Sequence, residues 1–197
     1  MPDSIKDFIK KSPYVLADGA MGTYFAKLSG ISIDRCELAN IESPDVIKRI
    51  HREYIAAGAR LIKTNTFAAN TVSLKRDFCT IKDIVKRGFE IANSAAQEKN
   101  VHVLADIGPI AEIEGHDSFS EYKAIVDVFL DSGARNFIFE TFGSPDKLVE
   151  ICRYIKLKDS KIFILAQFAV TPEGCTRKGI RGESIIKAVV DSGIVDA

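Results

Sequence analysis

The sequence predicts a single α/β domain built like the first part of a (β/α)8 TIM barrel. β-rich runs alternate with amphipathic helix patterns, five such units fit in 197 residues, and the last four residues begin another β-rich run. Parallel strands need helical crossovers, so this alternation leaves a doubly wound open sheet or a barrel. A barrel usually needs about 250 residues. We therefore expect residues 1–197 to form one domain with about the first five βα units and the start of strand six, and a five-stranded open sheet is the alternative.

Five short runs rich in β-branched and aromatic residues predict the strands. They cover residues 14–17, 60–63, 101–105, 136–139 and 161–166, and residues 194–197 begin the sixth. A helical pattern follows each complete run. Ser43 with Pro44 and Ser144 with Pro145 are typical of helix starts, and Gly58 is typical of a helix end. The apolar stripes of the other four helices cover residues 81–92, 122–130, 148–155 and 185–190.

The composition argues against several classes of protein. Lys and Arg together number 27 and are balanced by 27 Asp and Glu, so no net field favours nucleic acid or an anionic membrane. No apolar run approaches the roughly 20 residues that span a bilayer, which predicts a cytoplasmic protein. The four cysteines stand apart without a Cys-x-x-Cys pair, which indicates reduced thiols rather than a disulfide framework.

Polar residues follow the predicted strands, at the edge where active sites form in both architectures. They are Asp18, Asn65, Asp106, Glu140 and Gln167. We expect them to meet at one mouth. Two carboxylates there could hold an ammonium group, and backbone N–H groups of the turn at 19–22 could receive a carboxylate. This pairing suits a free amino acid.

Each candidate also has a structural interpretation. Asp106 and Asn65 could simply satisfy turn backbone, whereas Glu140 directly follows an apolar run, where a carboxylate is costly without a partner. His51 and His102 are interpreted as packing or surface residues. Lys63, near the end of a strand, leaves open a lyase or aldolase that uses a Schiff base.

Several separate motifs resemble the homocysteine S-methyltransferase family. They are LADGAMGT (16–23), ELAN (37–40), TNTF (64–67), IGP (107–109) and ETF (140–142). They are most similar to the homocysteine domain of methionine synthases and of bifunctional homocysteine methyltransferase/methylenetetrahydrofolate reductase proteins. The resemblance implies a (β/α)8 barrel that methylates the thiol of homocysteine to form methionine.

The resemblance also implies roles for individual residues and cofactors. Asp18 and Glu140 match carboxylates that hold the homocysteine amino group, Gly19 and Ala20 match the turn that receives its carboxylate, and Asn65 matches a polar position near the thiol. The family binds that thiol to zinc. The methyl donor would be methylfolate or methylcobalamin, with a downstream corrinoid, folate or reductase domain as partner; S-methylmethionine is the alternative donor.

The family's three zinc-binding cysteines would follow the sixth and eighth strands, beyond Ala197. None of Cys36, Cys79, Cys152 and Cys175 matches a ligand position, so no metal or catalytic residue is assigned. We expect a fragment that is inactive alone. A non-catalytic barrel that only binds an amino acid is the further alternative.

Overall fold

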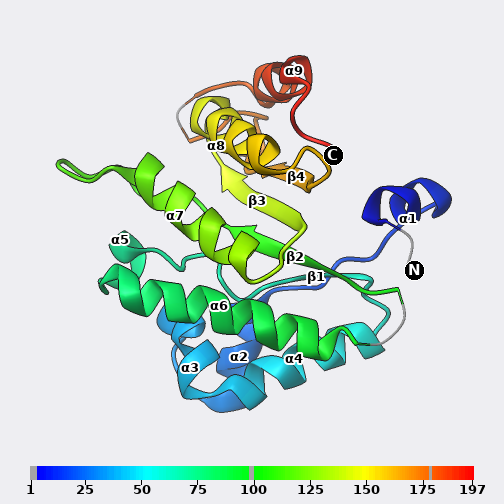
Figure 1. Cartoon of the computed structure of the whole chain (residues 1–197), viewed down its shortest axis with the longest axis vertical. Helices are drawn as coiled ribbons and strands as arrows, with labels where there is room; N and C mark the ends of the chain where they lie inside the picture. Colours follow the sequence, from blue (N-terminus) through cyan, green and yellow to red (C-terminus); the bar gives the residue numbers. More distant parts are fainter. Residues whose placement is uncertain (1–3, 98–99, 178) are drawn as a thin grey trace.

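The computed structural model describes residues 4–97, 100–177 and 179–197, which form a parallel sheet with helical crossovers (Figure 1). The strands are β1 (Leu61–Lys63), β2 (His102–Ile107), β3 (Asn136–Phe142) and β4 (Phe163–Phe168). The helices are α1 (Ile5–Lys11), α2 (Met21–Ser29), the 3₁₀ helix η1 (Ile33–Leu38), α3 (Ala39–Glu42), α4 (Pro44–Ala56), α5 (Thr71–Leu74), α6 (Phe78–Ala95), α7 (Ser118–Asp131), α8 (Pro145–Lys158) and α9 (Gly182–Ser192).

The strands lie in chain order, β1-β2-β3-β4, and each neighbouring pair is parallel. The predicted strand at 14–17 is wrong as a full strand, because only Ala17 forms a bridge, to Leu61. Tyr14 and Leu16 are 84% and 54% exposed, so this run lacks the burial that β-branched and aromatic residues need to stabilise a strand. At the other edge, the backbone N–H groups of Asp196 and Ala197 donate to Ile164.

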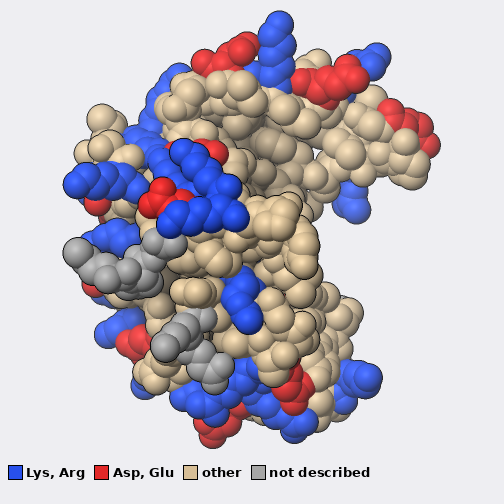
Figure 2. Space-filling model, turned by 90° about the vertical axis from the view of Figure 1, so that its right-hand side faces the viewer, with Lys and Arg blue, Asp and Glu red and all other residues tan. Residues whose placement is uncertain are grey.

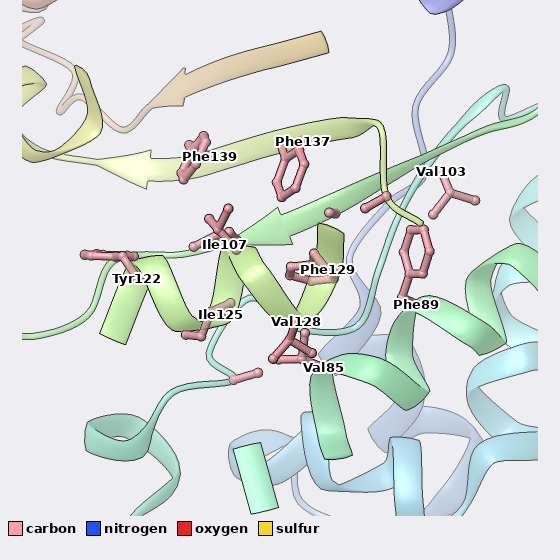
Figure 3. Close-up of a cluster of buried hydrophobic side chains, with 14 of the residues drawn as sticks. Val85, Phe89, Val103, Ile107, Tyr122, Ile125, Val128, Phe129, Phe137 and Phe139 are labelled. Atoms are coloured by element: carbon pink, nitrogen blue, oxygen red, sulfur yellow. The ribbon is translucent and has the colours of Figure 1, made fainter. Parts of the chain in front are cut away.

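The helix-facing side of the sheet carries the main core. Side chains alternate between the faces of a strand, so Val103 and Ile107 of β2 and Phe137 and Phe139 of β3 point towards α6 and α7 (Figure 3). Phe129 of α7 packs edge-on against Phe137, with ring centroids 5.9 Å apart. This core fixes the strands whose opposite face carries the polar residues described below.

On the opposite face of the sheet, apolar side chains come first along each strand, and charged side chains follow towards the carboxyl ends of the first three strands. Leu61, Leu104, Ile138 and Phe163 form a buried cluster with Ile5 of α1. Two residues further along the first three strands stand Lys63, Asp106 and Glu140. The period of two therefore places these three charged side chains on one face at the carboxyl end of the sheet.

The sequence patterns locate five crossover helices, α4, α6, α7, α8 and α9. Pro44 and Pro145 stand at the starts of α4 and α8 as expected. On the face shown in Figure 2, side chains of opposite charge lie among one another, in agreement with the balanced composition. Among the described residues, none of the helices has the length and apolar character to cross a bilayer.

Candidate substrate-binding site

A cavity of about 410 Å³ opens beyond the carboxyl ends of β1, β2 and β3. It is lined by residues 18–22, Cys36, Glu37, residues 63–68, Asp106 and Glu140. Of the expected mouth residues, Asp18, Asn65, Asp106 and Glu140 are brought together. Gln167 is not: it lines a separate cavity beside β4 and α9.

Asp18 follows the bridge residue Ala17, and its side chain is only 2% exposed. Its Oδ2 accepts a hydrogen bond from the backbone N–H of Lys63 at 2.9 Å, while its Oδ1 has no hydrogen-bond partner among the described residues. Burial raises the pKa of Asp18 to about 6, against the lowering effect of that hydrogen bond and of the Lys63 charge. Asp18 therefore changes charge near neutral pH.

Lys63 and Glu140 form an ion pair inside the cavity. The Lys63 Nζ lies 2.6 Å from Glu140 Oε1 and 4.0 Å from Asp18 Oδ1. Burial lowers the pKa of Lys63, but the hydrogen bond and charge of Glu140 outweigh it and leave the pKa raised. A Schiff-base lysine must be a neutral amine, so this environment disfavours the lyase interpretation.

The backbone of β3 is irregular around Glu140. The register with β4 shifts between Phe139 and Phe142, and Thr141 adopts a left-handed conformation with φ 63°. The sequence placed Glu140 after its strand, whereas it lies within β3. Bulges of this kind re-aim side chains next to binding sites, and such backbone strain persists where the surrounding structure enforces it.

Asp106 lies within β2 and is 3% exposed. Its backbone N–H donates to Thr64 Oγ1 at 2.9 Å, and its carbonyl accepts from Thr66 Oγ1 at 2.7 Å. Its carboxylate Oδ1 has no hydrogen-bond partner among the described residues. Burial, followed by the nearby charge of Glu140, raises the pKa of Asp106 well above its ordinary value.

The expected turn at 19–22 is a helix start. Ala20 is the N-cap of α2 and offers no side-chain cap, so the first backbone N–H groups of the helix lack the usual partners at the cavity. Tyr54 of α4 donates its hydroxyl to the Ala20 carbonyl at 3.0 Å. A Cβ at Gly19 would lie 2.8 Å from the Tyr54 hydroxyl, so a larger residue there would displace the Tyr54 ring.

The side-chain amide of Asn65 is held by the protein. Its Nδ2 donates to the Cys36 carbonyl and to Asn40 Oδ1, both at 2.9 Å, and its Oδ1 accepts from the Cys36 thiol at 3.3 Å. Asn40 reaches it across Gly88 of α6, where a Cβ would lie 2.6 Å from Asn40 Nδ2. Both amide donors of Asn65 are thus used, and only acceptor capacity is left for a ligand.

Sequence reasoning did not assign Cys36, Glu37 or Tyr54 to the site. Cys36 and Glu37 are buried on η1, and Glu37 Oε1 accepts from the Ala68 backbone N–H at 2.9 Å. Only the resemblance motif at 37–40 pointed to this segment. Cys175 does not line the cavity.

The described residues do not form a metal centre. No three His, Cys, Asp or Glu side chains among them are grouped as metal ligands. Burial raises the pKa of both Cys36 and Cys152 to about 12, which opposes the thiolate that zinc requires. Residues 4–97, 100–177 and 179–197 therefore do not fit a zinc site by themselves.

The fold is that of an α/β protein with a parallel sheet, and the cluster forms a candidate small-molecule site at the carboxyl ends of the strands. The chain belongs to the homocysteine S-methyltransferase family, whose model matches residues 15–196. Methionine synthase of Mycobacterium leprae is 34% identical over 153 residues, covering 64% of this chain and 12% of that protein. Betaine–homocysteine S-methyltransferase 1 of Xenopus laevis is 24% identical over 159 residues, covering 76% of this chain and 39% of that protein.

The fold is shared with a solved structure. The metallated form of the homocysteine methyltransferase MmuM from Escherichia coli superposes with a TM-score of 0.76 at 19% identity, covering 96% of this chain and 74% of that one. The chain spans well under half the length of the two curated relatives above.

Proposed function

We propose that this chain forms the homocysteine-binding part of an enzyme that transfers a methyl group to the homocysteine thiol, giving methionine. The observation that carries the proposal is the convergence of Asp18 and Glu140 around one ammonium position in the cavity. In the structure, the Lys63 ammonium lies 2.6 Å from Glu140 and 4.0 Å from Asp18. Carboxylates placed in this way suit the amino group of an amino acid.

The rest of the cavity supports a bound amino acid. The uncapped start of α2, at Gly19 and Ala20, offers backbone N–H groups and a helix dipole to the substrate carboxylate. Asn65 keeps acceptor capacity towards a thiol S–H, while its own orientation is fixed by Cys36 and Asn40. These residues bind and orient homocysteine; methyl transfer needs further groups.

We propose that the sheet is part of a (β/α)8 barrel within a single domain. Strands in uninterrupted chain order support this, because a doubly wound sheet reverses its order at a switch point. Ala17 pairs with β1 and residues 196–197 pair with β4, so further backbone extends the sheet at both edges of the four strands. The family match over residues 15–196 agrees with one domain.

Zinc and the methyl donor are proposed from the family resemblance. The described residues fit no metal site, so the proposal assigns the zinc ligands to residues other than these. Methylfolate or methylcobalamin is the proposed donor, and S-methylmethionine is the alternative. We propose that the 197-residue chain binds homocysteine without methylating it.

Calorimetry of this chain with homocysteine tests the proposal. We expect saturable binding without added zinc, and Glu140→Gln should weaken it about tenfold or more, because a hydrogen bond to a charged group contributes about 1.5–3 kcal/mol. The matched control is Glu150→Gln, at an exposed position of α8, which should bind like the wild type. Equal affinity of the Glu140 variant and the wild type would refute the assignment.

A further inference from the structure

The Lys63 ammonium occupies the position that the proposed function gives to the substrate. We propose that Lys63 is a specificity-determining residue, which competes with the substrate ammonium for Glu140 and Asp18 and so sets the affinity of the cavity for amino acids. This inference rests on the proposed function. Neither the sequence motifs nor the comparisons give Lys63 this role.

The geometry requires competition. A substrate ammonium bound to Glu140 Oε1 would need a contact of about 2.7–2.9 Å, and Lys63 Nζ already makes that contact at 2.6 Å. Two cations cannot share one position, and like charges a few ångströms apart inside a protein repel strongly. The lysine must therefore move before an amino acid is fully bound.

Asp106 provides a place for the displaced lysine. Its carboxylate lines the same cavity and is buried, with Oδ1 lacking a hydrogen-bond partner among the described residues. The nearby Asp106 is among the groups that raise the pKa of Lys63. The flexible four-carbon stem of lysine allows such a change of partner, and the arriving ammonium would favour the ionised form of the buried Asp106 carboxyl.

This exchange makes the cavity selective. Among its lining residues, Lys63 is the cation and Asp18, Glu37, Asp106 and Glu140 are the carboxyl groups. A ligand without an ammonium group leaves the Lys63–Glu140 pair in place. A ligand with an ammonium group takes the place of Lys63 beside Glu140, and Lys63 moves to Asp106. Each of the two ammonium groups then has a carboxylate partner.

A double-mutant cycle measured by calorimetry at pH 8 tests this exchange. We expect Lys63→Met to bind homocysteine about tenfold more tightly, because a competing charged contact of about 1.5–3 kcal/mol is removed. Asp106→Asn should weaken binding in the wild type but have little effect in the Lys63→Met background. Additive effects of the two substitutions would mean that Asp106 does not receive the lysine.

Controls separate the competing explanations. Lys147→Met removes a lysine whose ion pair with Glu112 lies outside the cavity, and it should leave the affinity unchanged. Lys63→Gln repeats the test in case the Met variant does not fold. Weaker binding in the folded Lys63 variants would mean that Lys63 contacts the substrate directly, and would overturn the inference.

An experiment on the wild-type chain requires no variant. The side-chain ammonium signal of Lys63, followed by ¹⁵N NMR, should shift on addition of homocysteine but not of 4-mercaptobutanoate, which lacks the amino group. Homocysteine that binds without shifting this signal would refute displacement while leaving the proposed function intact. A wild-type chain that binds no homocysteine would overturn the proposed function, and this inference with it.

Discussion

The proposed role of Asp18 predicts that ligand binding depends on pH, because burial raises the pKa of this carboxyl to about 6. Below that pH the carboxyl is neutral and loses its attraction for an ammonium group. We expect the homocysteine affinity of the wild type to rise between pH 5 and pH 7 and then to level off, with at most about a tenfold change per pH unit. Calorimetry across this range measures it.

Asp18→Asn is the matched variant for this pH profile. The amide keeps the size of the side chain but does not titrate, so affinity should be low and should change little from pH 5 to pH 7. A variant that kept the wild-type rise in affinity would assign the titration to another group. Glu150→Gln again provides the unaffected control, since Glu150 is exposed and outside the cavity.

His51 affects stability rather than binding. It is completely buried on α4, and neither ring nitrogen has a hydrogen-bond partner among the described residues. Burial lowers its pKa from 6.5 to about 4, so the unfolded chain takes up a proton first as the pH falls. From pH 7 to pH 5, His51 should therefore remove about 2 kcal/mol from the free energy of unfolding.

Urea denaturation of the wild type and of His51→Gln measures this contribution. The difference in free energy of unfolding between the two proteins should change with pH in favour of the variant, because glutamine does not titrate. Equal pH slopes for the two proteins would show that His51 is not the group responsible. Comparing differences rather than absolute values cancels the other titrating groups, including Asp18.

At the scale of elements, the start of α2 depends on its contact with α4. The Gly19 backbone packs against the ring of Tyr54, whose hydroxyl binds the Ala20 carbonyl. We expect Gly19→Ala to displace that ring, to break its hydrogen bond to Ala20 and to destabilise the chain by about 0.5–1.5 kcal/mol, the contribution of one hydrogen bond. Thermal unfolding measures the loss, and homocysteine affinity should fall with it.

Gly143→Ala is the control for this substitution. An added Cβ at Gly143 meets nothing within 4 Å, and its φ is not in the left-handed range. This variant should therefore unfold and bind like the wild type. If Gly19→Ala were equally silent, the position of α2 would not depend on Tyr54.

Local patterns could predict the crossover helices because each has an apolar stripe and several also have recognisable ends. Ser43 with Pro44 and Ser144 with Pro145 marked two helix starts. The same approach missed α2, because Ala20 gives no side-chain cap and adjacent glycines suggested a turn. The sequence also did not show that β3 continues past its irregular register with β4, so Glu140 was expected directly after this strand rather than within it.

The site could be predicted only as a set of strand ends. Asp18, Asn65, Asp106 and Glu140 were expected together because parallel strands end at one edge, and the cavity contains all four. Their partners depend on tertiary contacts that no local pattern encodes. The ion pair of Lys63 with Glu140, which joins two strands, is the clearest case.

At the scale of the whole molecule, the region beyond β4 has exposed apolar side chains around a second cavity, separate from the candidate site. A second cavity of about 710 Å³ is lined by β4, α9 and the segment at 195–197. Val170, Ile186 and Val190 line it and are 50%, 56% and 70% exposed. Contiguous exposed apolar side chains favour association in water.

We expect the 197-residue chain to self-associate through this surface as its concentration rises. Ile186→Lys combined with Val190→Lys should shift the chain towards monomer, because both positions are exposed on α9 and charges there oppose burial. Sedimentation velocity over a concentration series measures the effect. Leu157→Lys is the control, since Leu157 is 86% exposed on α8 but does not line the cavity. If that control dissociated the chain equally, general charge rather than this surface would govern association, and a wild type that stayed monomeric throughout would contradict the prediction.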